Sequence, residues 1–385
     1  MRKLKGLVEK KIIRAATLGT SLNTFCEGLL KELMGEGYEV IALSSPDEDL
    51  TVLGEREGVR TIGVKMERRV SPFKDIVSLM KITRVLMREK PDMVHSMTPK
   101  AGLLCMMAAK MAGVPIRLHT FTGLVWPTAT GLSRRILMMT DKITCACATH
   151  IVPEGEGVKQ DLQRCITKKP MKVLGYGNVR GIDLNYWKRN VEKAEDGRLT
   201  FVFVGRVVRD KGINELVQAY VKLHKEYNGT RLLLVGRYEE NLDPILPETK
   251  QLIESFDSIE ALGEQKDVRP CYERGDVLVF PSYREGFPNV VLEAGAMGLP
   301  SIVTDINGSR EIIEQGKNGM IVPPHDEKAL YNAMKWMIEH PDERKKMKEN
   351  ARPMVASRFE QSYVRQCLKD YYKEILSGIT PTHGC

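Results

Sequence analysis

Short apolar runs rich in β-branched residues alternate with longer amphipathic runs along the chain, and this alternation restricts the fold more than any other feature. The short runs suit buried strands, and the runs with apolar residues at i, i+3 and i+4 suit helices. Predicted strands cover residues 12–19, 38–45, 92–97, 115–121, 145–153, 199–206, 231–236, 258–263, 276–282 and 300–305. Predicted helices cover residues 24–37, 75–90, 101–113, 133–143, 213–227, 267–275, 290–298 and 361–376. The pattern predicts an α/β fold of two doubly wound, Rossmann-like domains that face a cleft.

A Gly-rich segment at 175–183 separates the two series of strands and helices. The 385 residues are enough for two domains with separate cores. We predict a first domain over 1–184 and a second over 185–358, and we expect the segment 359–385, after a helix break at Pro353, to pack back on the first domain. Doubly wound sheets bind ligands beyond the carboxyl ends of their strands. The loops predicted to carry chemistry therefore follow Leu18, Phe121, Val204, Val235 and Phe280.

The first half of the chain is basic. Residues 1–190 hold 31 Lys and Arg against 19 Asp and Glu, whereas residues 191–385 hold 27 against 31. A cationic half suits nucleic acid, an anionic membrane surface or a phosphorylated substrate. Aromatic residues make up only 6% of the chain, and no basic stripe is interleaved with stacking rings, so nucleic acid is the weakest of these partners. We therefore expect a phosphorylated substrate and an anionic membrane surface as partners.

The sequence also bears on location. No apolar run reaches the roughly 18 to 20 residues of a membrane-spanning helix. The basic N-terminus lacks the continuous apolar region and cleavage site of a signal peptide. The eight cysteines are scattered and mostly lie in apolar runs, as in a reducing compartment. We expect a cytoplasmic protein that attaches peripherally to the inner face of the cytoplasmic membrane.

Two short patterns resemble metal or redox motifs but have simpler interpretations. Cys145-Ala-Cys147 suits the alternation of a strand better than a metal pair. Asp47-Glu48-Asp49 is formally a D-x-D, but it follows Ser-Ser-Pro and suits a solvated turn. The chain has no P-loop, and the glycines of GYGNVRG are not spaced for a dinucleotide. We predict no metal site and no cofactor, and the patterns argue against a dehydrogenase.

The sequence FPSYREGFPNVVLE over 280–293 carries the strongest chemical signal. A strand is expected to end at Phe280 and a helix to begin near Asn289, so the first-turn N–H groups suit a diphosphate. Glu285, before the loop, can accept hydrogen bonds from sugar hydroxyls, and Glu293, one turn into the helix, can bind a vicinal diol such as a ribose. Ordinary surface glutamates are the alternative for this pair.

Upstream, Arg206 and Lys211 lie in the loop that follows the opening strand of the second half. Permanent positive charge there can neutralise the two phosphates of a nucleotide and of a leaving diphosphate. A solvated basic loop is the alternative interpretation. Glu285, Glu293, Arg206 and Lys211 thus form one predicted set in and after loops at the carboxyl ends of strands.

Several motifs resemble a known family. GRVVRDKG, LLLVGRYE, PSYREGFPNVVLEAGAMGLP and NGMIVPP look like the C-terminal half of the retaining GT-B glycosyltransferases of family four. VHSMTPKAGLLCMMAAKMAGVPIRLHTFTGLVW resembles the N-terminal half of the branch that builds bacterial capsule, O-antigen and related lipid-linked glycans. The resemblance runs from about Arg14 to Arg358, with the motifs in the expected order.

The resemblance implies roles for individual residues of the second half. Arg206 and Lys211 would hold the donor diphosphate, Glu293 the ribose, and Glu285 the hydroxyls of the transferred sugar. Further donor contacts would come from Gly286, Phe287, Pro288, Asn289 and Val290 at the phosphate and sugar, and from Leu262, Gly263 and Gln265 at the base.

In the first half, Gly19 and Thr20 match the family's small-residue loop near the phosphates and the acceptor. His119 matches the position near the anomeric carbon and is counted with the catalytic residues, with a hydrogen-bonded core histidine as the alternative. Thr122 stands where many relatives have a second histidine, so it is assigned to acceptor binding and not to a general base. Basic candidates for acceptor diphosphate or membrane contacts are Lys100, Arg68, Arg69, Arg134 and Arg135.

The resemblance implies a metal-independent hexosyltransferase in bacterial surface polysaccharide synthesis. The enzyme would move a sugar, with retention, from a UDP-hexose or UDP-N-acetylhexosamine to a polyprenyl-diphosphate-linked saccharide. The leaving phosphate itself would take the acceptor proton. Two alternatives are a non-hydrolysing UDP-N-acetylglucosamine 2-epimerase, which shares the fold and needs no acceptor, and a silent subunit that binds a nucleotide sugar.

Overall fold

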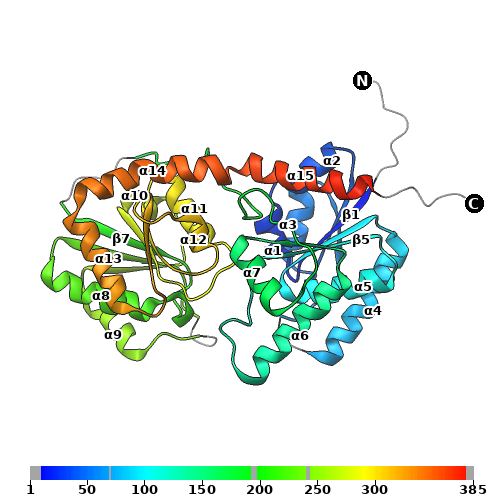
Figure 1. Cartoon of the computed structure of the whole chain (residues 1–385), viewed down its shortest axis with the longest axis horizontal. Coiled ribbons are helices and arrows are strands. Elements are labelled where there is room, and N and C mark those ends of the chain that lie inside the picture. Colours follow the sequence, from blue (N-terminus) through cyan, green and yellow to red (C-terminus); the bar gives the residue numbers. More distant parts are fainter. Residues whose placement is uncertain (1–9, 69–70, 192–196, 240–242, 379–385) are drawn as a thin grey trace, which may run out of the picture. The chain divides into compact units, whose positions relative to one another are not determined.

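The computed structural model describes residues 10–68, 71–191, 197–239 and 243–378 of the chain. Within these ranges the chain divides into two compact units. The first unit comprises the described residues up to Arg180 and from Val364 onward, and the second comprises those between Gly181 and Tyr363. Each unit is built around one parallel sheet with helices on both faces (Figure 1).

The first unit holds a six-stranded sheet in the order β3-β2-β1-β4-β5-β6. Its strands are β1 (Lys11–Ala15), β2 (Glu39–Ser44), β3 (Arg60–Gly63), β4 (Met93–Met97), β5 (Ile116–Phe121) and β6 (His150–Pro153). Its helices are α1 (Gly19–Cys26), α2 (Leu29–Gly35), α3 (Glu48–Glu57), α4 (Pro72–Glu89), α5 (Pro99–Met111), α6 (Gly131–Cys147), α7 (Glu156–Cys165) and most of α15 (Gln361–Ser377). The strand order reverses between β1 and β4.

The second unit repeats this topology, with the order β12-β11-β10-β7-β8-β9. Its strands are β7 (Leu199–Val204), β8 (Thr230–Val235), β9 (Ile259–Gly263), β10 (Val277–Phe280), β11 (Ser301–Thr304) and β12 (Gly319–Val322). Its helices are α8 (Ile213–Glu226), α9 (Pro247–Ser255), α10 (Arg269–Arg274), α11 (Asn289–Ala296), α12 (Ser309–Ile312), α13 (Glu327–Glu339) and α14 (Pro341–Phe359). The strand order reverses between β7 and β10.

Side-chain alternation along the strands explains the layered core of the first unit. Ile13 of β1 packs in a cluster with apolar residues of α4, α5, α6 and α7, whereas its neighbour Ile12 packs with those of α1, α2, α3 and α15. Parallel strands covered on both faces need apolar residues at successive positions, which is why they appear as short continuous apolar runs in the sequence. The predicted α/β class with two doubly wound sheets is confirmed.

Five local predictions are wrong. The segment 24–37, predicted as one helix, holds the end of α1 and all of α2, which are separated at Gly28 with φ +72°. The first strand ends at Ala15, not at 19, because α1 begins at Gly19. Asp47 does not lie in a solvated turn: it is the N-cap of α3, and its side chain accepts a hydrogen bond from the Leu50 N–H. Cys145 and Cys147 lie at the end of α6 and not on a strand. Pro353 lies inside α14, and no helix break occurs there. Because Pro353 is exposed, the backbone carbonyl that its missing N–H leaves unpaired can be hydrated.

No helix in the described part of the chain is both long enough and apolar enough to cross a membrane.

Candidate functional site

The first candidate site lies in the second unit, where the strand order reverses. The loops after β7 and β10 leave neighbouring strands at their carboxyl ends, which is the usual ligand position in a doubly wound sheet. The β7 loop contains Arg206 and a turn of 3₁₀-helix over Arg209–Lys211, and the β10 loop runs from Pro281 to the start of α11 at Asn289. The topology therefore brings both predicted cations and the glutamate motif to one edge of the sheet.

Two glycines let these loops pack against each other. Gly212 has φ +71°, and a Cβ there would lie 2.1 Å from the carbonyl oxygen of Pro281. Gly308 has φ +74°, and a Cβ there would lie 2.4 Å from the carbonyl oxygen of Gly286. Any other residue would clash with the backbone and would also adopt a strained conformation. The β7 loop, the β10 loop and the loop before α12 are thus held in fixed contact.

Lys211 and Glu285 form an ion pair at the centre of this site, although 74 positions separate them. Both side chains are largely buried, with exposed fractions of 15% and 16%. The Ser282 hydroxyl donates a second hydrogen bond to Glu285, with an Oγ–Oε1 distance of 2.7 Å. The Lys211 ammonium also lies 5.2 Å from the centre of the Phe280 ring. The pair presents one cation and one carboxylate side by side at the carboxyl end of β10.

Arg206 forms the second ion pair of the site. Its Nη1 lies 2.6 Å from Oε2 of Glu239, which follows β8. Arg237 contacts the same carboxylate at 3.1 Å. The hydrogen bond from Arg206 lowers the pKa of Glu239, so this carboxylate stays ionised. Arg206 is more exposed than Lys211, so it is the cation more open to an incoming anion.

Glu293 lies on α11 and is 7% exposed. Its Oε2 accepts a hydrogen bond from the Tyr272 hydroxyl at 3.2 Å, and burial together with this carboxylate raises the pKa of Tyr272. The neighbouring Phe287 belongs to the core, where its ring lies 5.3 Å from that of Phe359. The side chain of Phe287 is therefore not available to a ligand, and only its backbone is.

The other predicted donor residues lie around the same edge. Pro288 precedes α11 as its N-cap, Asn289 begins that helix, and the carbonyl of Val290 accepts a hydrogen bond from Tyr272. Leu262 and Gly263 end β9, and the Gln265 amide donates to the Leu262 carbonyl at 2.6 Å. The loops after β7, β9 and β10 thus bring the predicted set to the carboxyl edge of one sheet.

The first unit has its own reversal of strand order, between β1 and β4, and the groups there are mostly neutral. The hydroxyls of Thr17 and Thr98, which follow these two strands, lie 2.8 Å apart. The Gly19 N–H donates to Asp47 at 2.9 Å, and the Thr20 hydroxyl donates to Asp49. The two aspartates of the D-x-D tripeptide therefore fix the start of α1 and cap α3.

His119 lies near the end of β5 and is 1% exposed. Its Nδ1 lies 2.8 Å from the Ser96 hydroxyl, and its ring packs edge-on against Phe121. Burial lowers the pKa of His119 to about 3, so the imidazole is neutral at physiological pH. Gly102 of α5 makes room for this ring, because a Cβ there would lie 2.4 Å from Cε1 of His119.

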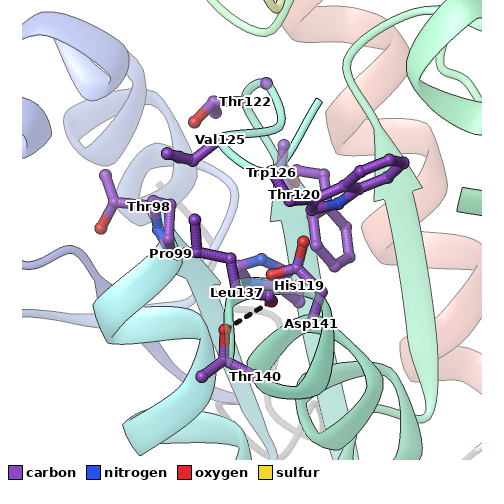
Figure 2. Close-up of a pocket in the computed structure, with 12 residues that line it drawn as sticks. Thr98, Pro99, His119, Thr120, Thr122, Val125, Trp126, Leu137, Thr140 and Asp141 are labelled. Atoms are coloured by element: carbon purple, nitrogen blue, oxygen red, sulfur yellow. Dashed lines mark hydrogen bonds between the residues drawn. The ribbon is translucent and has the colours of Figure 1, made fainter. Parts of the chain in front are cut away.

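His119 lines a pocket with an empty volume of about 330 Å³, drawn in Figure 2. Thr98 and Pro99 come from the start of α5, Val125 and Trp126 from the loop after β5, and Asp141 from α6. Thr122, assigned to the acceptor, also lines the pocket. Burial raises the pKa of Asp141 to about 7, an effect that the nearby Trp126 side chain only partly opposes. The pocket thus combines a neutral histidine with a carboxyl group that is partly protonated near pH 7.

Of the basic candidates of the first unit, only Arg134 contacts a described residue that lines this pocket, because its guanidinium carbon lies 5.7 Å from the centre of the Trp126 ring. Lys100 is largely buried and forms an ion pair of 2.5 Å with Asp75. Arg68, Arg134 and Arg135 are exposed, and Arg69 lies outside the described residues. The assignment of Lys100 and Arg69 to acceptor binding stays a prediction.

Sequence patterns did not point to five residues of the two sites. Ser282 and Glu239 hold Glu285 and Arg206, Ser96 and Gly102 hold His119, and Asp141 lines the pocket. Only Gly102 gives a local signal, since a glycine inside a helix marks a close approach. Glu239 and Ser96 are ordinary polar residues whose partners are distant in sequence, Ser282 lies three residues before its partner Glu285, and Asp141 is an ordinary helical acid.

Two doubly wound sheets in separate units, with charged pairs at the reversal of strand order in the second, define an α/β protein of the GT-B class. Comparison with known proteins agrees with this class and also identifies the family. The family model described as "Glycosyl transferases group 1" matches residues 187–354, and the one described as "Glycosyl transferase 4-like domain" matches residues 21–177. The chain belongs to the group 1 glycosyltransferases, and the resemblance read from its motifs is confirmed.

Curated relatives extend over most of the chain. The capsular polysaccharide biosynthesis glycosyltransferase CapM of Staphylococcus aureus is 30% identical over 378 residues, which cover 95% of this chain and 98% of CapM. The UDP-Gal:alpha-D-GlcNAc-diphosphoundecaprenol alpha-1,3-galactosyltransferase of Escherichia coli is 27% identical, over 69% of this chain and 71% of the relative.

A solved glycosyltransferase from Rickettsia africae ESF-5 superposes with a TM-score of 0.77 at 22% identity, over 96% of this chain and 100% of that chain. Anabaena Alr3699/HepE, solved with UDP, superposes with a TM-score of 0.77 at 16% identity, over 94% and 100%. These two likenesses concern the fold.

Proposed function

We propose that this glycosyltransferase moves a hexose or N-acetylhexosamine from a UDP-sugar to a polyprenyl-diphosphate-linked saccharide, with retention of anomeric configuration, in bacterial surface polysaccharide synthesis. The observation that carries the proposal is the Lys211–Glu285 ion pair beside Arg206 at the reversal of strand order in the second unit. A nucleotide sugar bears both anionic phosphates and neutral hydroxyls, and this site offers partners for both.

In this proposal the donor diphosphate contacts Arg206 and Lys211, and the sugar hydroxyls contact Glu285. The diphosphate then takes the place of a carboxylate beside each cation, so charge stays compensated when the donor binds. Ser282 keeps Glu285 oriented after Lys211 turns to the phosphate. Glu293, held by Tyr272, accepts hydrogen bonds from the ribose hydroxyls.

The reaction breaks the bond between the anomeric carbon and the diphosphate oxygen, and it forms a bond from the same carbon to an acceptor hydroxyl oxygen. The acceptor proton passes to the leaving diphosphate on the same face of the sugar, which gives retention. Arg206 and Lys211 stabilise the negative charge that develops on the leaving group. We propose that these two cations suffice and that turnover needs no divalent metal.

The acceptor belongs to the first unit in this proposal. The pocket offers the neutral groups of His119 and Thr122 and the partly protonated carboxyl of Asp141 as hydrogen-bonding partners, which suits a saccharide. His119 would contact the substrate as a neutral hydrogen-bonding group and not as an acid. The name of the Escherichia coli relative supports a lipid diphosphate acceptor, since that enzyme is named for a diphosphoundecaprenol substrate. We propose peripheral attachment to the inner face of the cytoplasmic membrane for the same reason.

The proposal is tested by incubating the protein with a panel of UDP-, GDP- and ADP-sugars and a polyprenyl-diphosphate-linked N-acetylhexosamine. We expect UDP release and a saccharide extended by one sugar, with the donor's anomeric configuration, and we expect turnover to survive EDTA. A donor isomer formed without acceptor would instead indicate an epimerase. Donor binding without turnover of any acceptor would indicate a silent subunit. Complete loss of turnover with EDTA, restored by Mn²⁺, would contradict metal independence.

A further inference from the structure

Large apolar side chains are exposed on two helices of the first unit. On α4 they are Phe73, Ile76, Val77, Met80 and Met87, and on α6 they are Leu132, Ile136 and Met139. Their spacing of three and four residues places each set along one side of its helix. Phe73 is 88% exposed and Leu132 is 72% exposed, values that a folded surface rarely gives to such residues. Each helix therefore has an outer apolar stripe besides the stripe that it buries.

The two stripes belong to one face of the unit. α5 packs against both α4 and α6, and all three helices contribute to the same core cluster on one side of the sheet. Figure 1 shows these helices next to one another. The exposed apolar residues of α4 and of the first half of α6 thus lie on either side of α5, whose Met111 is also exposed, whereas Ile143 and Cys147 in the second half of α6 pack into the core.

The charges around these stripes have one sign. Every exposed charged residue of α4 and α6 is a cation, and these are Lys74, Lys81, Arg84, Arg88, Arg134, Arg135 and Lys142. Lys74 forms an ion pair with Glu67 and the Arg134 guanidinium lies over the Trp126 ring, whereas the other five form no ion pair with a described residue. The three acidic residues of these helices, Asp75, Glu89 and Asp141, are all partly buried. On the opposite side of the sheet the exposed charges of α3 are Glu48, Glu55 and Arg56, so the cationic character is specific to this face.

We infer that the outer face of α4 and α6 docks on an anionic lipid bilayer, with Phe73 and Leu132 inserted among the headgroups. This inference rests on the proposed function and deepens it by naming the surface. Apolar stripes flanked by unpaired Lys and Arg match the structure of a bilayer surface, whose anionic headgroups lie above an apolar interior. A protein partner would need anionic and apolar groups alternating over the same area.

The position of the acceptor pocket supports this choice of occupant. α6 contributes Leu137, Thr140 and Asp141 to the pocket that contains His119, while Leu132 and Ile136 of the same helix are exposed on the outer face. If the bilayer lies against the outer face of α6, a saccharide linked to one of its lipids would be separated from the pocket by the width of that one helix. Docking of this face would keep the pocket next to the bilayer from which its substrate comes.

The test is flotation of the full chain with vesicles of phosphatidylcholine alone or with 30% phosphatidylglycerol, without donor or acceptor. We expect binding to the anionic vesicles that falls as salt rises, and at least a tenfold loss of binding in Phe73→Ser/Leu132→Ser. Lys81→Gln/Arg84→Gln should lose binding on anionic vesicles as well. The matched control Val52→Ser/Leu246→Ser removes exposed apolar side chains from α3 and from the second unit, and it should bind like the unchanged protein.

Two further measurements distinguish a loss of membrane docking from unfolding and from a loss of catalysis. Circular dichroism should show that Phe73→Ser/Leu132→Ser is folded, and transfer to a short, water-soluble acceptor should be unchanged while transfer to a vesicle-embedded acceptor falls. Flotation is measured without turnover, so it decides the docking surface even if no sugar transfer is found. Equal flotation of the variant and the unchanged protein would overturn the inference. A dimer in light scattering that Phe73→Ser/Leu132→Ser converts to a monomer would also overturn it, because a second copy would then cover this face.

Discussion

The two units share a topology, but the groups at the two reversals of strand order differ. In the second unit this position holds two ion pairs, Arg206–Glu239 and Lys211–Glu285. In the first unit it holds a pair of threonine hydroxyls and, on the next strand, a neutral histidine bonded to Ser96. The same backbone frame thus offers cations paired with carboxylates in one unit and, besides the two aspartates that hold the start of α1, uncharged hydrogen-bonding groups in the other. The difference matches the two substrates of a glycosyltransferase, one of which loses a charged diphosphate while the other presents a hydroxyl.

The largest effect should follow the removal of charge from the second unit. Lys211→Ala removes a cation from the leaving group and leaves Glu285 without its ion-pair partner. We expect turnover to fall by roughly 10²- to 10³-fold, the size seen when one charge-stabilising group is removed from an active site. The matched control Lys222→Ala breaks an exposed ion pair with Glu327 in the same unit and should leave the rate unchanged. Equal rates in both variants would remove Lys211 from the site.

The two glutamates should separate binding from turnover. Glu293→Gln weakens hydrogen bonds to the ribose, and we expect bare UDP to bind about 10-fold more weakly, since a hydrogen bond to a charged group is worth roughly 1.5 to 3 kcal/mol. Glu285→Gln should lower turnover by about 10- to 100-fold without weakening UDP binding, because it frees Lys211 for the phosphates. Calorimetry with UDP and rates with the full donor provide both values. A similar loss of UDP affinity in the two variants would show that these roles are wrongly assigned.

Gly102→Ala, which adds one methyl group, tests the role of His119 in the first unit. Gly102→Ala places a Cβ against the His119 ring, so the ring must move away from Ser96. We expect a loss of about 1 to 3 kcal/mol in unfolding free energy and roughly tenfold slower turnover, with unchanged UDP affinity. Gly35→Ala is the matched control, because nothing lies within 4 Å of the added methyl in α2. A loss of UDP affinity in Gly102→Ala would show that the two units are not separate in function.

The smallest effect concerns the buried carboxyl of the pocket. The pKa of Asp141 is raised from 3.8 to about 7, so the folded protein resists ionisation that the unfolded chain undergoes freely. Stability should therefore be unaffected by this group below pH 4 and should fall as pH rises toward 7. Asp141→Asn removes the penalty, and we expect it to be more stable than the unchanged protein by roughly 1 to 2 kcal/mol at pH 8 but not at pH 4. Urea unfolding at both pH values measures this, and a gain that is the same at both would contradict it.

Most strands could be predicted from the sequence because buried parallel strands leave a strong local pattern. The ends of β5, β7, β8 and β10 lie where the apolar runs predict them. β3 (Arg-Thr-Ile-Gly) was not predicted because it holds one large apolar residue and none of its residues is buried, so it leaves no apolar run. α3 was not predicted because its capping tripeptide was interpreted as a turn. The segment with Cys145 and Cys147 has small and apolar residues at every position, so periodicity could not distinguish helix from strand.

The motif predicts Lys211 and Glu285 as separate donor contacts, and these roles stay a prediction. Nothing local in the sequence indicates that the two side chains form an ion pair with each other. Pairing depends on which loops meet, and this depends on the strand order and on glycines such as Gly212 and Gly308 that admit close approach. The role of Ser96 also depends on register, which sets it beside His119 on the neighbouring strand.

Helix α15 has a consequence for how the protein is made. Leu368, Tyr371, Tyr372 and Leu376 complete a core that begins with Ile12, and the Tyr372 hydroxyl accepts a hydrogen bond of 2.6 Å from the fully buried Arg14. β1 therefore leaves the ribosome long before α15, which covers one face of its sheet, and the second unit is translated between them. Until α15 is translated, Arg14 lacks one of its partners and part of the first sheet is uncovered. The core of the first unit can thus be completed only after the second unit has been synthesised.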